Sequence, residues 1–301
     1  MNVYYSSDFA GSGHDFETTR KARWVAQSLG LAPLDGVQLV PPPALTMEQL
    51  AQVHDADYVR AVQTGVPLQL AQSQGFGWDA GLWPMVLASN GGAVAAALDA
   101  LHSGLSGSLA SGLHHARRGA GYGYCTFNGL VLAAHAALAN GARSVLILDL
   151  DAHCGGGTAS LIADDARIWQ LDLSVDDFDA YPSSDRVRLQ MVERGADYLH
   201  QIERGLQQLW RRAPSFDLCL YNAGMDPFEG CPDGGLSGIT RELLAARESL
   251  VFNACRSQNL PVAFFLAGGY IGDRLDQHGL VELHRLTLSA AVQSEPAKRA
   301  S

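Results

Sequence analysis

The sequence is poor in cysteine and in positive charge, and it lacks the features of exported and membrane proteins. Its 301 residues include five cysteines. None forms a C-x-x-C pair, which predicts reduced thiols in a cytoplasmic protein. Acidic residues outnumber basic ones by 31 to 21, which argues against nucleic acid as a partner. The N-terminus shows no signal peptide, and no apolar run approaches the roughly 20 residues of a membrane helix, so we expect no membrane association.

Short apolar runs alternate with segments of helical periodicity along the chain. Strands that are apolar almost throughout and alternate with helices indicate a parallel sheet covered on both faces. We see no repeat or linker, and 47% of the residues are hydrophobic, so we expect one domain over residues 1–301. Thr240 is a candidate N-cap. The expected strands are residues 2–5, 37–40, 107–111, 144–150, 168–174, 216–222 and 262–268, and the expected helices are residues 17–29, 47–64, 83–103, 128–139, 188–211 and 239–257.

Polar residues gather where these strands end. In a parallel α/β sheet, ligands bind beyond the carboxyl ends of the strands. Asp149, Asp151 and His153 are spaced two apart, so in a strand they share one face. Because Asp226 arrives from a separate strand, it can meet Asp151 and His153 at one metal ion. Further candidates at strand ends are His114 and His115, which follow residues 107–111, and Tyr270, which follows residues 262–268.

Each of these residues also has an ordinary structural explanation. Asp226 precedes a proline and would suit a helix N-cap, a lone buried histidine is more often hydrogen-bonded than ligating, and glycine pairs usually mark turns. The combination is harder to explain in that way. Asp149, Asp151 and His153 in one apolar strand would be costly without a cation or hydrogen bonds. We therefore expect a metal site.

Four blocks in order resemble the zinc-dependent histone deacetylase family, which includes acetylpolyamine amidohydrolases and other acyl-amide hydrolases. The blocks are GLHHARRGAGYGYCTFNGL, LILDLDAHCGGGT, YNAGMDPFEG and LAGGY. Weaker similarity, with His54 and Tyr58, extends the resemblance over about residues 14–285. It implies a three-layer α/β fold of the arginase/deacetylase type, with a mainly parallel eight-stranded sheet between helices. It also implies a zinc-dependent hydrolase that removes an acetyl or other acyl group from an acyl-lysine or an acylpolyamine.

The resemblance assigns roles at the metal and beside it. Asp151, His153 and Asp226 match the zinc ligands, and three protein ligands leave an open position for water and substrate. His115 would remove the water proton and then protonate the leaving amine, and the Tyr270 hydroxyl would hold the oxyanion. The remaining implied residues are His114 beside the base, Asp149 as its partner, Ser174 with Asp149 at a structural potassium ion, Gly123 and Tyr124 at one tunnel wall, Phe178 or Tyr181 at the other, and Asp233 at the rim.

The chain departs from the family pattern beside the metal ligands. Cys154 replaces a second histidine, which raises the hypothesis of a cysteine nucleophile, although most free cysteines simply pack. Gly156 replaces the Asp or Asn that usually lies near the second tandem histidine. We therefore expect His115 to lack a side-chain partner, which leaves open how His114 and His115 divide their work. Asp233 is either a contact for a cationic amine or a turn residue before Gly234.

Two other functions are open at this point. An arginase-like ureohydrolase would share the fold and hold two manganese ions, but Gly155 stands where its second metal needs a carboxylate. A non-catalytic acyl-amine sensor would need none of the catalytic groups, which are all present. The expected partners are a small acyl amine or an acyl-lysine peptide. A homo-oligomer is neither predicted nor excluded by these residues.

Overall fold

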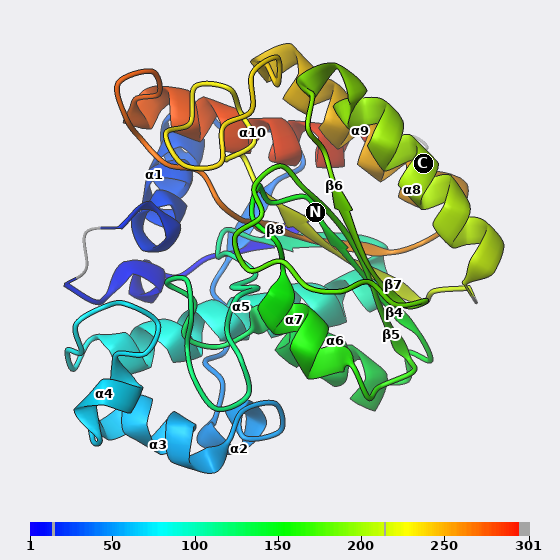
Figure 1. Cartoon of the computed structure of the whole chain (residues 1–301). Coiled ribbons are helices and arrows are strands. Elements are labelled where there is room, and N and C mark those ends of the chain that lie inside the picture. Colours follow the sequence, from blue (N-terminus) through cyan, green and yellow to red (C-terminus); the bar gives the residue numbers. More distant parts are fainter. Residues whose placement is uncertain (14–15, 214, 295–301) are drawn as a thin grey trace, which may run out of the picture.

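An eight-stranded sheet, in which all neighbouring strands are parallel, forms the middle layer (Figure 1). The structure, a computed structural model, describes residues 1–13, 16–213 and 215–294. The strands lie in the order β2-β1-β3-β8-β7-β4-β5-β6, which confirms the expected fold class. They are β1 (Asn2–Tyr4), β2 (Gln38–Val40), β3 (Leu105–Ser108), β4 (Val145–Asp149), β5 (Ile168–Ser174), β6 (Val187–Met191), β7 (Leu218–Ala223) and β8 (Val262–Leu266).

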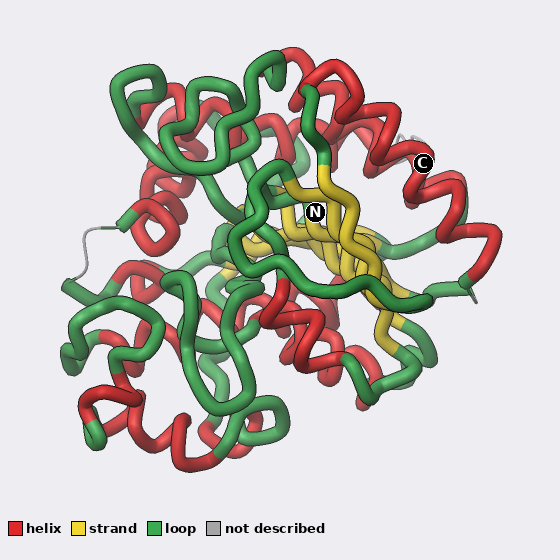
Figure 2. Tube along the Cα trace, in the orientation of Figure 1, coloured by secondary structure: helices red, strands yellow, loops and turns green. Residues whose placement is uncertain are grey.

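Helices cover both faces of the sheet (Figures 1 and 2). Helices α1, α8, α9 and α10 pack on one face, and α3, α5, α6 and α7 pack mainly on the other. Their bounds are α1 (Glu17–Leu31), α2 (Met47–Leu50), α3 (Ala56–Thr64), α4 (Leu68–Ala71), α5 (Leu82–Ser103), α6 (Gly129–Ala139), α7 (Gly156–Ile162), α8 (Tyr198–Arg212), α9 (Arg241–Ser257) and α10 (Gln277–Ser294).

Strand β4 shows why the central strands are apolar throughout. Leu146 and Leu148 belong to the core beneath α1 and α8–α10, whereas Val145 and Ile147 belong to the core beneath α5 and α6. Successive side chains of a strand point to opposite faces, so a strand covered on both sides must be apolar at every position. The polar residue Asp149 is the exception, and it lies at the carboxyl end, where the site begins.

Helix α5 is long and apolar enough to cross a membrane by length and composition, which the sequence analysis did not anticipate. However, 67% of its most apolar 18-residue window is buried inside the protein. A helix that packs in a protein core has the same composition. The feature is therefore weak evidence for a membrane span.

Some expected elements are wrong in part. The segment 188–211, expected to be a helix, contains strand β6 before α8 begins. The segment 47–64 is divided into α2 and α3, and α10 was not expected at all. The N-cap expectation for α9 is confirmed, because the Thr240 hydroxyl accepts a hydrogen bond from the Leu243 amide. Strand β6 pairs with β5 at the edge of the sheet, whereas the adjacent strands β3, β8, β7, β4 and β5, whose carboxyl ends carry the expected site, were all expected.

Candidate active site

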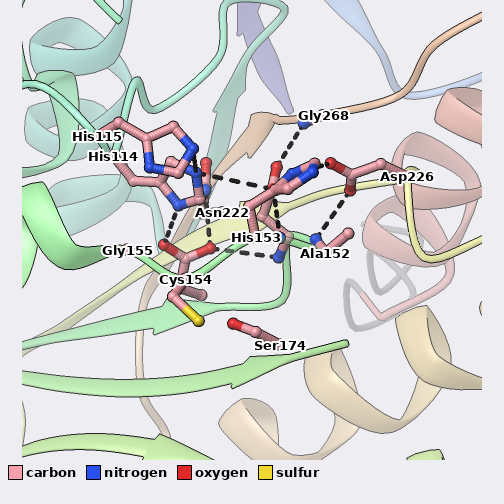
Figure 3. Close-up of polar contacts among 12 residues, drawn as sticks. His114, His115, Ala152, His153, Cys154, Gly155, Ser174, Asn222, Asp226 and Gly268 are labelled. Carbon is pink, nitrogen blue, oxygen red and sulfur yellow. Dashed lines mark hydrogen bonds and ion pairs between the residues drawn. The ribbon is translucent and has the colours of Figure 1, made fainter. Parts of the chain in front are cut away.

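The side chains of Asp151, His153 and Asp226 converge beyond β4 and β7 as a candidate metal centre. Figure 3 labels His153 and Asp226 of this group. Their ligand atoms lie within 4.8 Å of one another, and all three residues are buried. His153 Nδ1 lies 3.2 Å from Asp151 Oδ1 and 3.2 Å from Asp226 Oδ2. Zinc bonds of about 2.0–2.2 Å at tetrahedral angles place neighbouring ligand atoms about 3.3 Å apart. The separations therefore fit one tetrahedral ion.

Backbone amides fix the two carboxylates of this centre. The Gly268 amide donates a hydrogen bond of 2.7 Å to Asp151, and the Ala152 amide donates one of 3.0 Å to Asp226. A Cβ atom at Gly268 would lie 1.9 Å from Asp226 Oδ2, so only glycine fits there. This Asp226 oxygen is buried and accepts no hydrogen bond. A buried carboxylate oxygen without a donor is costly, which a bound cation would relieve.

The electrostatics of the centre also favour a cation. Burial alone would lower the pKa of His153, but its hydrogen bond with Asp151 and the close carboxylate of Asp226 raise it to about 12. Two buried carboxylates thus hold positive charge at this point. A divalent ion supplies that charge and leaves the imidazole neutral to act as a ligand.

His114 forms a buried pair with a carboxylate on strand β4. Its Nδ1–H donates to Asp149 Oδ2 over 2.8 Å, as expected. Asp149 Oδ1 also accepts hydrogen bonds from the Asn222 side chain and from the Asp151 amide. Burial disfavours a charged imidazole, but Asp149 and Asp151 outweigh it and raise the pKa of His114 to about 10.

His115 has a carboxylate partner, so the expectation that it lacks one is wrong. Its Nδ1–H donates to Asp179 Oδ2 over 3.0 Å. Asp179 comes from the loop after β5, and its side chain is 3% exposed. The Nε2 atoms of His115 and His114 lie 3.1 Å apart. Burial and the positive charge of His114 lower the pKa of His115 to about 4, which leaves its imidazole neutral.

Tyr270 reaches the centre through two glycines after β8. Its ring centroid lies 6.2 Å from that of His153. Gly269 has φ of +148°, a conformation that side-chain-bearing residues rarely adopt. Burial and the charges of Asp226 and Asp151 raise the pKa of Tyr270, so its hydroxyl keeps its proton.

Aromatic side chains surround the mouth of the site. Phe178 approaches His115 edge-on at 5.0 Å and stacks on Tyr122 at 5.2 Å. Tyr124 packs against Phe16 on another side, with 4.4 Å between the ring centroids. The exposed fractions of Tyr122, Tyr124 and Phe178 are 40%, 46% and 39%, so part of each residue is available to a ligand. A Cβ at Gly123 would lie 2.6 Å from the His115 ring and 3.0 Å from Phe178, so its backbone forms part of the wall.

Tyr181 and Ser174 point to a second buried carboxylate instead of the mouth. Both hydroxyls donate to Asp172, over 3.0 Å and 2.6 Å. Asp172 pairs in register with Asp149 across the sheet, and burial together with the charge of Asp149 raises its pKa to about 7. Of the two candidates for the opposite wall, the structure therefore places only Phe178 at the mouth.

Cys154 is placed for packing. It is fully buried, and its thiol lies 3.3 Å from the Asp176 carbonyl and 3.7 Å from the Met191 sulfur. Burial and the charge of Asp172 raise the pKa of this thiol to about 12. Because a thiolate is the nucleophilic form, these surroundings argue against a cysteine nucleophile.

The second metal of an arginase-like site has no room. A Cβ at Gly155 would lie 2.7 Å from Gln170 Nε2 and 2.9 Å from Asp149 Oδ2. A carboxylate therefore does not fit at this position without displacing Asp149. Among the described residues, Asp151, His153 and Asp226 form the single group of three ligands.

Asp233 lies at the rim, beside the metal centre. Its Oδ1 is 3.4 Å from His153 Nε2, and its side chain is 67% exposed. Gly234, which follows it, has φ of +87°, as in a turn. The structure thus places Asp233 both in a turn and at the mouth of the site.

His54 and Tyr58, from the weaker block of similarity, contact the loop that carries the tandem histidines. His54 Nε2 accepts a hydrogen bond from the Asn128 amide, and its Nδ1–H donates to the Arg117 carbonyl. The Tyr58 hydroxyl donates to the Thr126 carbonyl over 2.6 Å. His54 and Tyr58 therefore hold the loop that carries the tandem histidines.

The sequence analysis missed several residues of the site. Asp179 is 64 positions from His115, so no local spacing connects them. Lys21 of α1 is fully buried, and its Nζ has no hydrogen-bond partner. Burial lowers the pKa of Lys21 to about 8, although Asp151 and Asp226 oppose the shift. The position of Lys21 on an apolar helix face could have indicated a buried lysine.

Comparisons with known proteins agree with this geometry. A model of the histone deacetylase domain matches residues 14–284. An uncharacterized protein of Picosynechococcus sp. is 34% identical over 268 residues, which cover 85% of this chain and 88% of that protein. Histone deacetylase 2 of Arabidopsis thaliana is 33% identical over 190 residues, which cover 60% of this chain and 48% of that protein. An acetylpolyamine aminohydrolase structure from Burkholderia pseudomallei superposes with a TM-score of 0.80 at 18% identity, covering 97% of this chain and 98% of that one, which is a likeness of fold.

Proposed function

Because the chain belongs to the histone deacetylase family, we propose that it is a zinc-dependent hydrolase that removes an acetyl or other acyl group from an amine. The observation that carries the proposal is the convergence of Asp151, His153 and Asp226, with one buried oxygen of Asp226 lacking a hydrogen-bond donor. The tandem histidines and Tyr270 stand beside this group. The combination supplies a cation site, a base and an oxyanion donor side by side.

Asp151, His153 and Asp226 would hold the zinc ion, which when bound polarises the amide carbonyl and lowers the pKa of water. His115 accepts the water proton at Nε2, because its Nδ1–H is committed to Asp179. His115 then returns a proton to the leaving amine. His114, held by Asp149 over 2.8 Å, keeps a positive charge beside this base.

Tyr270 supplies a hydrogen bond to the developing oxyanion. Its hydroxyl keeps its proton because burial and the Asp226 and Asp151 charges raise its pKa. Donors aimed at a developing charge cost no reorganisation during the reaction, and one such donor typically contributes about 2.7–4 kcal/mol. The residue therefore acts on the carbonyl oxygen and not on the proton.

The aromatic mouth fits the alkyl chain of an acyl-lysine or an acylpolyamine. Tyr122, Tyr124 and Phe178 are partly exposed around the entrance, and extended methylene chains bury well against aromatic rings. Asp233 adds one carboxylate at the rim, which favours a substrate with a second positive charge. A small acyl amine is therefore the preferred substrate class, and an acyl-lysine peptide is the competing one.

The other possible functions are less well supported. The crowding at Gly155 argues against a ureohydrolase with two manganese ions. A non-catalytic sensor would not require His115 and Tyr270 beside the cation site. A potassium ion near Asp149 and Ser174 and a cytoplasmic location remain predictions, and the buried Asp149–Asp172 pair is compatible with a monovalent cation.

A turnover screen tests the proposal. Zinc-loaded protein is assayed with acetyl-lysine peptides, acetylpolyamines and longer acyl amides, beside the Asp226→Ala variant. We expect release of acid from at least one class, with both bound zinc and activity lost in the variant. Zinc binding without turnover of any acyl amine would favour the sensor.

A further inference from the structure

Asp179 occupies the space that a side chain at position 156 would need. A Cβ atom at Gly156 would lie 2.3 Å from the Asp179 carbonyl oxygen and 2.6 Å from its Oδ1. The loop after β5 thus fills the place beside the second tandem histidine that the sequence leaves empty. We propose that Asp179 is the positioning residue of His115, supplied by this loop in place of a carboxylate at position 156. The inference rests on the proposed hydrolase function.

The hydrogen bonds of Asp179 define what it does to His115. Asp179 Oδ2 accepts from His115 Nδ1–H over 3.0 Å and from the Gly157 amide over 3.1 Å. With its Nδ1 proton committed to a carboxylate, the imidazole presents its Nε2 lone pair on the opposite side. That nitrogen lies 3.1 Å from His114 Nε2, which in turn lies 3.7 Å from Asp151 Oδ1, so the two histidines stand beside the metal centre. Asp179 therefore sets both the ring orientation and the tautomer that a base requires.

The surrounding contacts hold Asp179 in place. The Arg117 guanidinium forms an ion pair with Asp179 Oδ1 and lies 5.5 Å above the Tyr122 ring. Tyr122 in turn stacks on Phe178, the residue before Asp179. The Cys154 amide donates to the Phe178 carbonyl over 3.0 Å, which ties the loop to the metal-ligand segment. The loop is thus fixed at both sides of the carboxylate.

The backbone of Asp179 is also unusual. Its φ is +62°, in the left-handed region that aspartate tolerates better than most residues. Such a conformation costs energy and persists only where the surroundings impose it. A simple explanation is that Asp179 serves only as the anchor of Arg117. The two explanations predict different behaviour of Arg117 variants.

Kinetics of matched variants separate these explanations. Asp179→Gly removes the side chain and suits the positive φ, and Asp177→Asn is the control, because Asp177 is an exposed carboxylate of the same loop. We expect Asp179→Gly to lower kcat about 10- to 100-fold, the range found when the hydrogen-bond partners of metal ligands are removed. KM and zinc affinity should stay near the wild-type values, and the control should be unaffected. Arg117→Met should lower kcat much less than Asp179→Gly does. An equal fall in kcat would show that Asp179 serves only to anchor Arg117.

A double variant tests whether Asp179 acts through His115. In the His115→Ala background, Asp179→Gly should lower the residual kcat no further. A further fall as large as in the wild-type background would overturn the proposal, because the loop would then act elsewhere. The His115 imidazole proton resonances of the zinc-free protein give a readout that needs no substrate. The resonance of a hydrogen-bonded His115 Nδ1–H should be present in wild type and in Asp177→Asn and absent in Asp179→Gly. Because this measurement needs no substrate, it tests the role of Asp179 even if no substrate of the enzyme is found.

Discussion

Each of the two tandem histidines pairs with an aspartate, but the two aspartates lie on different kinds of element. His114 pairs with Asp149, the last residue of the central strand β4, whereas His115 pairs with Asp179 in a loop. The strand carboxylate is fully buried and held by Asn222 and a backbone amide. The loop carboxylate is held by the half-exposed Arg117 and by the Gly157 amide. Equivalent hydrogen bonds thus come from two different kinds of element, a central strand and a loop.

The difference shows how a site can keep its geometry while its sequence pattern changes. The glycines after Cys154 leave no side chain beneath the tandem histidines. A Cβ at Gly157 would lie 2.3 Å from the His115 backbone, and one at Gly156 would meet Asp179. The tight passage of the chain therefore requires small residues, and a loop residue provides the missing carboxylate. We therefore expect substitutions in the His114–Asp149 pair of the strand to destabilise the protein more than substitutions in the His115–Asp179 pair of the loop.

The largest expected effect tests the division of work between the two histidines. His115→Ala should lower kcat about 10²- to 10⁴-fold, the usual contribution of a general base. Tyr270→Phe should lower it about 10²- to 10³-fold, because it removes one oxyanion donor. Zinc should remain bound in both variants, as metal analysis can verify. If His114→Ala proves more damaging than His115→Ala, the two histidines have exchanged their roles.

Stability should differ between the two carboxylates. Asp149→Asn places an amide N–H against buried donors and should lower the free energy of unfolding by about 1–3 kcal/mol. Asp179→Asn should cost less than Asp149→Asn, because Arg117, one of the partners of Asp179, is 41% exposed and can turn to water. Urea unfolding of the zinc-free protein measures both. Equal losses would contradict the distinction between strand and loop.

The smallest expected effect concerns the rim. Asp233→Leu should shift the kcat/KM ratio from acetylpolyamine toward acetyl-lysine peptide by about 1.5- to 5-fold, which corresponds to the 0.2–1 kcal/mol of an exposed ion pair. Asp233→Asn is the matched control, since it removes the charge and keeps the shape. It should shift the ratio in the same direction. An unchanged ratio in both variants would make Asp233 a turn residue only.

The metal centre could be predicted from the sequence because its signals are local. Asp149, Asp151 and His153 alternate at a strand end, and the glycines before Tyr270 mark the bend that places it. The structure brings these residues together as expected. Parallel strands with adjacent carboxyl ends explain why residues far apart in the chain, such as His153 and Asp226, could also be grouped.

Other features depend on contacts that no spacing encodes. Asp179 lies in an irregular loop, and its distance from His115 is set by the packing of Phe178 and Tyr122. Strand β6 was taken for a helix because it is a short edge strand with partly exposed residues, so it lacks the apolar run of a central strand. Edge strands and loops carry weak patterns, since only one side of each is packed.

Titration of the metal-free protein with zinc, followed by hydrolysis of an acetylated amine, tests the central claim most directly. One centre formed by Asp151, His153 and Asp226 predicts that activity rises linearly and reaches its plateau at one equivalent of zinc. Asp226→Ala should bind no zinc in this range and remain inactive. A plateau at two equivalents, or hydrolysis that persists without metal, would contradict the account.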